Sequence, residues 1–564
     1  MGEVSSKLLR SSKLITTLVP PPGMQSPRPA TLRPVYNRRR MTSVRLSAAA
    51  SRPAGKRTCR ERKCIVAFLV ALMVASGASC RAVRTPQTDQ RYVQQLQPLL
   101  EQFVQWQEIP GLAIGIVENN QLVYAHTFGV KHLGRPADPL TTRSLFHMAS
   151  ITKPFVGTAI MQLVERRSVD LDAPVVKYLP YFHLADDRYK QITVREMATH
   201  ASGIPDVDDY EWDKPQYDDG ALERYVRSLT NQKLLFAPGE RVQYSNMAFE
   251  VLGDVVAKAS RESFDDYVQR HILASLKMTD STLLLKQANP TLLTWGHELD
   301  EQGKPFPSRV FPYNRMHSPS SNLHSNVLDM ARWAIANLNR GELEGRRILR
   351  ASTYDMMWKP AHQPGGPGQD GQTSVGISWW LGTYRGTRTI AHEGGDTGYR
   401  TDLVLLPDKG IAVVWMENGD WAANDDSLTR AALDVALGDT PAPIRTRRSL
   451  ESTLPTYQRG GIEAALNQYR MLRTSPRAEL YTFDEAELNA FGQYLIRQGH
   501  LRDAVRALET NVEMYPASGR AADALATAYE MDHNVPLAIR TYRTAVTLDP
   551  TLSHAKDRLK QLKH

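Results

Sequence analysis

Apolar and polar positions change from helical to strand spacing shortly after residue 85. Across residues 86–108 the apolar side chains recur every three or four positions, which predicts an amphipathic helix. Two short apolar runs follow at 112–117 and 122–128, joined by the polar residues 118–121. This pattern predicts two neighbouring strands.

Helical patterns then dominate from about residue 150 to residue 336, interrupted by loops that contain glycine and proline. Strand patterns return at 389–391, 402–406 and 411–416, and 425–435 is predicted as a closing helix. Strands at both ends with helices between them predict one sheet assembled from two distant segments. This is an α+β fold rather than an alternating βαβ fold.

Beyond a predicted linker at 438–460 the chain is helical and repetitive. Identical residues stand 34 positions apart in one register: Ala504 and Ala538, Arg506 and Arg540, Val512 and Val546, Pro516 and Pro550. This is the tetratricopeptide period, and it predicts an all-α repeat domain over 461–564. Because two repeats are few for a free-standing solenoid, either residues 461–490 add a degenerate third unit or the array packs on the preceding domain.

The first 80 residues have the composition of a disordered basic leader followed by a secretory signal. Basic residues precede the apolar run 65–74, and the small residues 75–79 follow it. Cys80 then resembles a lipoprotein processing site, while a simple signal peptide or an uncleaved anchor are the alternatives. We therefore expect an exported protein, either periplasmic or membrane-anchored, with membrane attachment through Cys80 or through the uncleaved signal.

The basic pI of 9.2 does not indicate a nucleic-acid partner. Residues 1–64 hold 15 Lys and Arg against 2 Asp and Glu, which leaves 54 basic and 58 acidic residues in the rest of the chain. A basic binding face would need its charge in the folded part. The three cysteines lie at 59, 64 and 80, and no His-Glu-x-x-His spacing occurs. We therefore expect no metal, no cofactor and no nucleic acid.

The candidate chemistry begins with Ser150 and Lys153, a Ser-x-x-Lys motif at a predicted helix start. That spacing places both side chains on one helix face, and a lysine whose pKa is lowered by burial can activate a serine hydroxyl. The motif alone is weak, because a second copy occurs at Ser553 and Lys556. The second copy lacks any supporting context, and we expect it to be a solvated helix face.

Two companion motifs strengthen the first copy. Tyr244 and Asn246 form the only Tyr-x-Asn in the chain, where a phenol can move a proton and an amide can orient a lysine or substrate; the alternative is a helix cap beside a buried tyrosine. His392, Gly394 and Gly395 lie between two strand patterns, where glycines admit a substrate to a strand edge and a backbone N–H can stabilise an oxyanion. The alternative for His392 is an ordinary edge-strand histidine.

Together these motifs resemble the signatures of the serine β-lactamase and penicillin-binding-protein superfamily, closest to its class C β-lactamase-like branch. That branch also holds esterases, D-aminopeptidases and D-alanyl-D-alanine carboxypeptidases. The resemblance covers about residues 86–437. It implies a β-lactamase/transpeptidase-like domain, with an antiparallel sheet flanked by helices, a helical subdomain and the active site between them.

By this resemblance, Ser150 forms an acyl-enzyme, Lys153 and Tyr244 share the proton transfers, and Asn246 orients Lys153 or the substrate. His392 stands where many members have lysine, and it should be only partly charged near neutral pH. The amides of Ser150 and Gly395 would form the oxyanion hole. The expected substrate is a D-amino-acid peptide, a β-lactam or a carboxylic ester. The alternative is a catalytically silent protein that binds peptidoglycan, with a protein partner on the repeat domain in either case.

Overall fold

The computed structural model describes residues 89–562, apart from 136–137, 301–302, 362–371, 422–425, 445–446, 477 and 479–480. Residues 82–564 form one compact unit. The predicted leader, signal and Cys80 lie outside the described residues. Among the described residues, no helix is long and apolar enough to cross a membrane.

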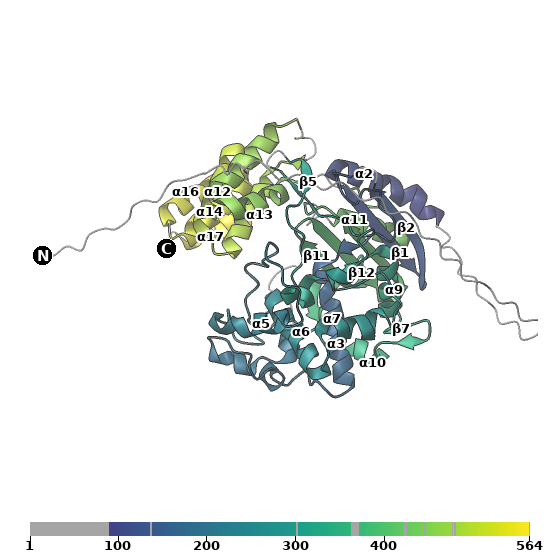
Figure 1. Cartoon of the computed structure of the whole chain (residues 1–564). Coiled ribbons are helices and arrows are strands. Elements are labelled where there is room, and N and C mark those ends of the chain that lie inside the picture. The colour runs from purple at the N-terminus through teal and green to yellow at the C-terminus, as the bar shows by residue number, and fades with distance from the viewer. Residues whose placement is uncertain are drawn as a thin grey trace, which may run out of the picture. The chain divides into compact units, whose positions relative to one another are not determined.

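The part of the described chain before α12 is built around a seven-stranded sheet in the order β2-β1-β13-β12-β11-β10-β9, antiparallel throughout (Figure 1). The strands are β1 Gly111–Glu118, β2 Gln121–Gly129, β9 Gln372–Gly376, β10 Trp379–Tyr384, β11 Thr387–Asp396, β12 Tyr399–Leu406 and β13 Ile411–Glu417. Since β1 pairs with β13, the sheet joins two segments that lie almost 300 residues apart. The prediction of one sheet from two distant segments is confirmed.

Helices cover both faces of this sheet, which explains why β1 is apolar along nearly its whole length instead of alternating. One face packs against α2 Gln97–Gln107 and α11 Ser427–Leu437, and the other packs against α9 Val327–Leu338 and the helical subdomain. Trp333 of α9 stacks on Phe155 in this second core with ring centroids 3.9 Å apart.

The helical subdomain lies between β2 and β9 in the chain. Its helices are α3 Thr152–Glu165, α4 Val194–Ala198, α5 Ala221–Ser228, α6 Asn246–Ser260, α7 Phe264–Val268, α8 Ser318–Ser321 and α10 Ala351–Met357. Short two-stranded ribbons join them: β3 Phe146–His147 with β6 His324–Ser325, β4 His297–Leu299 with β5 Pro305–Pro307, and β7 Glu342–Leu343 with β8 Arg346–Arg347.

The structure corrects several predicted boundaries. The helix predicted at 86–108 is described from residue 90 and opens with the π-helical segment Tyr92–Leu96. The His392 motif lies inside β11 and not between two strands, because the pairing of β11 with β12 continues to Asp396. Strands β9 and β10 were not predicted. Half of the predicted linker is helical, since α12 spans Ser449–Thr474 and kinks at Gly461.

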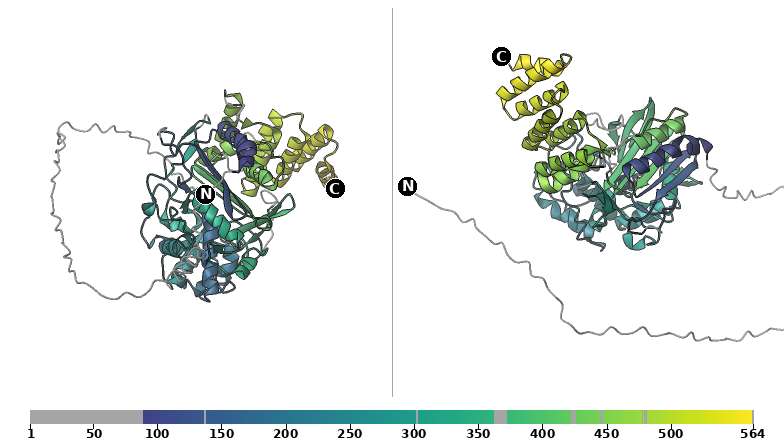
Figure 2. Two further views of the ribbon diagram at one scale, coloured as in Figure 1. Left: turned by 90° about the vertical axis from the view of Figure 1, so that its right-hand side faces the viewer. Right: turned by 90° about the horizontal axis from the view of Figure 1, so that it is seen from above.

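The C-terminal part is mainly helical, as predicted, with α13 Glu485–Arg497, α14 Leu501–Met514, α15 Gly519–Met531, α16 Val535–Leu548 and α17 Ser553–Gln561. Each of these helices contacts the next one in the chain (Figure 2). Helices α14 and α16 begin and end 34 residues apart, and α13 and α15 do so as well. The equivalent residues Ala504 and Ala538 are both fully buried, so small side chains stand where these helices meet. A strand pair, β14 Arg447–Arg448 with β15 Tyr481–Thr482, lies in the same part.

Candidate active site

Ser150 lies in a 3₁₀ turn, Ala149–Ile151, that leads directly into α3. Ala149 has a φ of 48°, a left-handed conformation that is costly for a residue with a Cβ. The turn is fixed from outside: the Met148 amide donates to Leu323 O at 2.7 Å, and the Thr401 hydroxyl donates to Met148 O at 3.0 Å. The strained backbone next to Ser150 is therefore held by the sheet and by the α8–β6 segment.

Lys153 occupies the first turn of α3 and is completely buried. Its Nζ donates to Ser150 Oγ at 2.9 Å, to Asn246 Oδ1 at 2.5 Å and to Ser320 O at 3.0 Å. Three acceptors match the three N–H bonds of an ammonium group. Burial lowers the pKa of Lys153 to about 8, although nearby carboxylates oppose that shift.

Tyr244 also contacts Ser150, since its phenol donates to Ser150 Oγ at 2.8 Å and Lys153 Nζ lies 4.9 Å from the centre of its ring. The Tyr244 ring stacks on His200 with a centroid distance of 4.4 Å, and His200 stacks in turn on Trp380. Burial raises the pKa of Tyr244 well above its ordinary value, so the phenol is neutral and carries its proton. Ser150 Oγ therefore accepts hydrogen bonds from both Lys153 and Tyr244.

Asn246 is the first residue of α6, and Ser245 caps that helix by accepting a hydrogen bond from the Ala248 amide. The sequence offered a helix cap and an orienting amide as alternatives for this motif. The two roles are compatible, because Ser245 binds the helix end while Asn246 Oδ1 faces Lys153. Asp206 Oδ1 accepts hydrogen bonds from the Asn246 amide at 2.8 Å and from its Nδ2 at 2.9 Å. Those bonds leave the Asn246 oxygen directed at the lysine.

The end of β11 forms the wall of the site beside Ser150. A Cβ on Gly394 would lie 2.3 Å from Met148 O and 3.2 Å from the Ser150 nitrogen, so this strand touches the Ser150 turn only because Gly394 has no side chain. β10 pairs with β11 up to Ala391, whereas β12 pairs up to Asp396. In the described ladder, residues 392–396 thus have a partner strand on one side only, and Gly395 lies within this open edge.

His392 is buried in β11, and its Nδ1 lies 2.7 Å from Glu393 O. Because a carbonyl oxygen only accepts, Nδ1 carries the proton and Nε2 is a buried acceptor, with no partner among the described residues. Burial, reinforced by Lys153, lowers the pKa of His392 to about 3. The expectation of a partly charged imidazole is therefore wrong: His392 is neutral near pH 7.

The structure thus brings Ser150, Lys153, Tyr244 and Asn246 into direct contact and places His392, Gly394 and Gly395 on the adjoining strand. Four contributors were missed by sequence reasoning: His200, Asp206, Ser320 and Glu250. Only His200 and Asp206 had a sequence signal, since they lie in and directly after residues 197–205, a segment whose sequence also resembles the same superfamily. The second Ser-x-x-Lys copy is, as predicted, on a helix surface, with Ser553 and Lys556 both exposed on α17.

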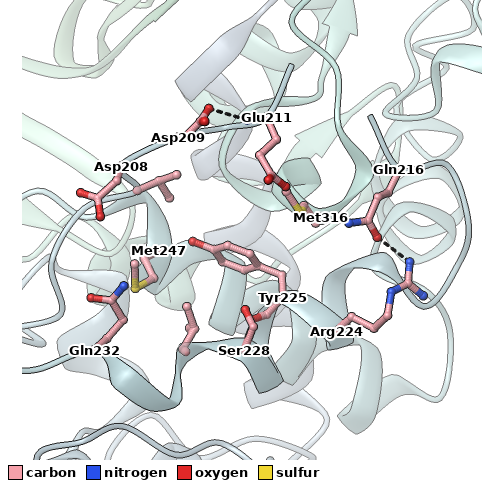
Figure 3. A pocket seen from close by; sticks show the side chains of 12 residues that line it. Asp208, Asp209, Glu211, Gln216, Arg224, Tyr225, Ser228, Gln232, Met247 and Met316 are labelled. Carbon is pink, nitrogen blue, oxygen red and sulfur yellow. Dashed lines mark hydrogen bonds between the residues drawn. The ribbon is translucent and has the colours of Figure 1, made fainter. Parts of the chain in front are cut away.

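A pocket of about 480 Å³ adjoins the Asp206–Asn246 contact, since its wall includes the next residue on each side, Val207 and Met247 (Figure 3). Tyr225 from α5 projects into it (Figure 3). The acidic side chains in the wall are Asp208, Asp209 and Glu211. Arg224, also in the wall, is engaged by Asp218 and Gln216. Among the described residues, no group of three His, Cys, Asp or Glu has the arrangement of a metal site.

Comparison with known proteins connects this geometry to a family. The family model described as "Beta-lactamase" matches residues 96–437. "Protein flp" of Staphylococcus aureus (strain MW2) is 24% identical over 328 residues, which cover 58% of this chain and 63% of that protein. "Penicillin-binding protein 4" of Amycolatopsis lactamdurans is 26% identical over 320 residues, covering 56% of this chain and 82% of that protein. The chain therefore spans less than two thirds of the Staphylococcus relative.

A solved structure shares the fold. The octameric penicillin-binding protein homologue from Pyrococcus abyssi superposes with a TM-score of 0.54 at 24% sequence identity, covering 64% of this chain and 80% of that one. This likeness supports a β-lactamase/transpeptidase-like architecture, as expected from the sequence.

Proposed function

The chain belongs to the β-lactamase family, and from that membership we propose that it is a serine hydrolase that forms an acyl-enzyme on Ser150. One observation carries the proposal: Ser150 Oγ accepts a hydrogen bond from Lys153 at 2.9 Å and another from Tyr244 at 2.8 Å. Two donors on one hydroxyl oxygen stabilise the negative charge that develops when the oxygen loses its proton.

Lys153 is the proposed base in acylation. A neutral amine has two N–H bonds and one lone pair, so loss of a proton from Lys153 releases one of its three acceptors. Ser150 is the only one of the three that also has a proton to give, and its hydroxyl can then donate to the lone pair. Attack on the substrate carbonyl transfers that proton to Lys153, and the oxyanion that forms is directed at the amides of Ser150 and Gly395.

Tyr244 is the proposed donor to the leaving group. Its phenol keeps its proton near neutral pH and lies on Ser150 Oγ, where the leaving atom departs. The protonated Lys153 then returns a proton to the Tyr244 phenolate, so both groups regain their starting protonation while Ser150 carries the acyl group. Water then repeats the sequence on the acyl-enzyme and releases the acid.

We propose carboxylic esters or D-amino-acid peptides as substrates in preference to β-lactams. Penicillins carry a carboxylate, and the neutral His392 offers that group no positive charge. The neighbouring pocket presents three carboxylates, which also disfavour an anion.

We further propose, from the leader sequence, that the protein is exported. From the 34-residue helix spacing we propose that the C-terminal helices dock a protein partner.

Intact-protein mass spectrometry after exposure to a fluorophosphonate, a p-nitrophenyl ester and a penicillin tests the proposal. We expect an adduct on the unchanged protein and on Ser553→Ala, the matched variant in the second Ser-x-x-Lys copy. Ser150→Ala should form none and should keep its circular dichroism spectrum. If none of the three reagents labels the unchanged protein, the hydrolase proposal fails and a silent binding protein of this fold takes its place.

A further inference from the structure

A fully buried acid–imidazole pair lies below Lys153. Glu250 of α6 and His317 are both 0% exposed. Glu250 Oε1 lies 3.2 Å from His317 Nδ1 and accepts a hydrogen bond from the Ser320 hydroxyl at 2.5 Å. The edges of three aromatic rings, Tyr210, Trp212 and Tyr225, enclose the imidazole.

This pair is unfavourable for the stability of the folded protein. Within the described part of the chain, Glu250 Oε2 and His317 Nε2 are buried without a hydrogen-bond partner. Burying a carboxylate with one oxygen unpaired is unfavourable, and apolar residues of similar size would avoid that desolvation cost. A purely structural role therefore explains the pair badly.

The pair is connected to Lys153 by covalent and hydrogen-bonded steps. Ser320 donates its hydroxyl to Glu250 and offers its carbonyl oxygen to Lys153 Nζ at 3.0 Å. On α6, Glu250 follows Asn246 by four residues, so one helix face carries both the amide that accepts from Lys153 and the carboxylate that fixes its other acceptor.

Other charged and titratable groups also face Lys153. They are Asp206 before α6, Asp396 at the end of β11, the phenol of Tyr244, and the imidazoles of His200 and His392. Of the carboxylates near Lys153, Asp206 is exposed and Asp396 contacts the His147 imidazole, whereas Glu250 is fully buried. The buried carboxylate is the one least screened by solvent.

We propose that Glu250 is a positioning residue of the hydrolase, which holds the Ser320 carbonyl on Lys153 and supplies the buried negative charge that opposes loss of the lysine proton. The inference rests on the proposed function of Ser150 and Lys153 and adds to it a determinant of working pH. Burial alone would lower the pKa of Lys153 further, and Glu250 is the largest of the opposing influences.

The test is the pH dependence of kcat/KM for a p-nitrophenyl ester in the full-length protein. In Glu250→Gln, the amide keeps the shape and an acceptor for Ser320 but removes the charge. We expect the midpoint of the rising limb to move down by roughly one pH unit. Asp265→Asn is the matched control, because Asp265 is also a buried carboxylate that anchors the neighbouring segment through Ser318 and Arg315. Its midpoint should equal that of the unchanged protein.

A merely structural role would lower the active fraction at every pH and leave the midpoint in place, so an unmoved midpoint in Glu250→Gln overturns the inference. If Glu250→Gln does not fold, Ser320→Ala replaces it, since the Ser320 hydroxyl lowers the pKa of Glu250 and its loss favours the neutral acid, which should move the midpoint in the same direction by a smaller amount. An unmoved midpoint in Ser320→Ala also overturns the inference. Fluorophosphonate labelling of the unchanged protein separates the two failures, because missing labelling refutes the proposed function itself.

Discussion

The pH profile of the unchanged enzyme tests the assignment of Lys153 as the base. Only the neutral amine can accept the Ser150 proton. With the pKa of Lys153 at about 8, about one tenth of the molecules are competent near pH 7 and about one hundredth near pH 6. The profile of kcat/KM reports the free enzyme. It should therefore rise about tenfold per pH unit up to pH 7 and level off above about pH 9.

A neutral p-nitrophenyl ester, followed at a wavelength where phenol and phenolate absorb equally, keeps substrate and product ionisation out of the measurement. Ser150→Ala supplies the background hydrolysis at each pH. The two imidazoles nearest the site cannot produce the rising limb, because burial lowers the pKa values of His200 and His392 below their usual range. A limb centred below about pH 7, or a flat profile after background subtraction, would refute lysine as the base.

Two further predictions concern single groups. Tyr244→Phe keeps the stacking on His200 but removes the hydroxyl on Ser150, so kcat/KM should fall by roughly 10²–10⁴ while the thermal midpoint stays near that of the unchanged protein; a loss below about threefold would exclude the phenol from proton transfer. Gly394→Ala should cost about 1–3 kcal/mol in unfolding experiments and most of the activity, because its Cβ would lie 2.3 Å from Met148 O. Gly395→Ala is its control for stability, since the atoms nearest to that Cβ belong to the flexible Arg400 side chain, with Nη1 at 2.9 Å, and equal losses of unfolding free energy in the two variants would contradict the packing argument.

Local signals in the sequence carried most of the fold. The apolar runs at 112–117 and 122–128 and the strand patterns at 402–406 and 411–416 marked β1, β2, β12 and β13. The signal is clearest in β1 and β13, because these strands are buried along nearly their whole length. Strands β9 and β10 escaped prediction for a physical reason. Their sequence mixes glycine, serine and two tryptophans, and residues 374–379 are all buried, so no alternation of apolar and polar positions develops.

The residues of the candidate site also differ in whether a local sequence pattern predicts them. Two short motifs at helix starts contain Ser150, Lys153, Tyr244 and Asn246. Their spacing alone places these residues close to a helix end. Glu250 and His317 are 67 residues apart and belong to no motif. Their pairing follows from the packing of α6 against the α8 segment, which no local pattern reveals. The neutral state of His392 was unpredictable for a related reason, since it depends on complete burial in the finished strand.

The hydrogen bond between the Thr401 hydroxyl and Met148 O joins residues 253 positions apart, and this separation delays its formation while the protein is being synthesised. At general elongation rates of about 5–20 residues per second, the ribosome adds Thr401 roughly 13–50 s after Met148. Until then the strained turn at Ala149 lacks its contact with the sheet, although Leu323, which accepts from the Met148 amide, is already present. The proposed nucleophile Ser150 is therefore synthesised well before the strand that completes its surroundings, and the proposed site can form only after the last strands of the sheet have paired with the first.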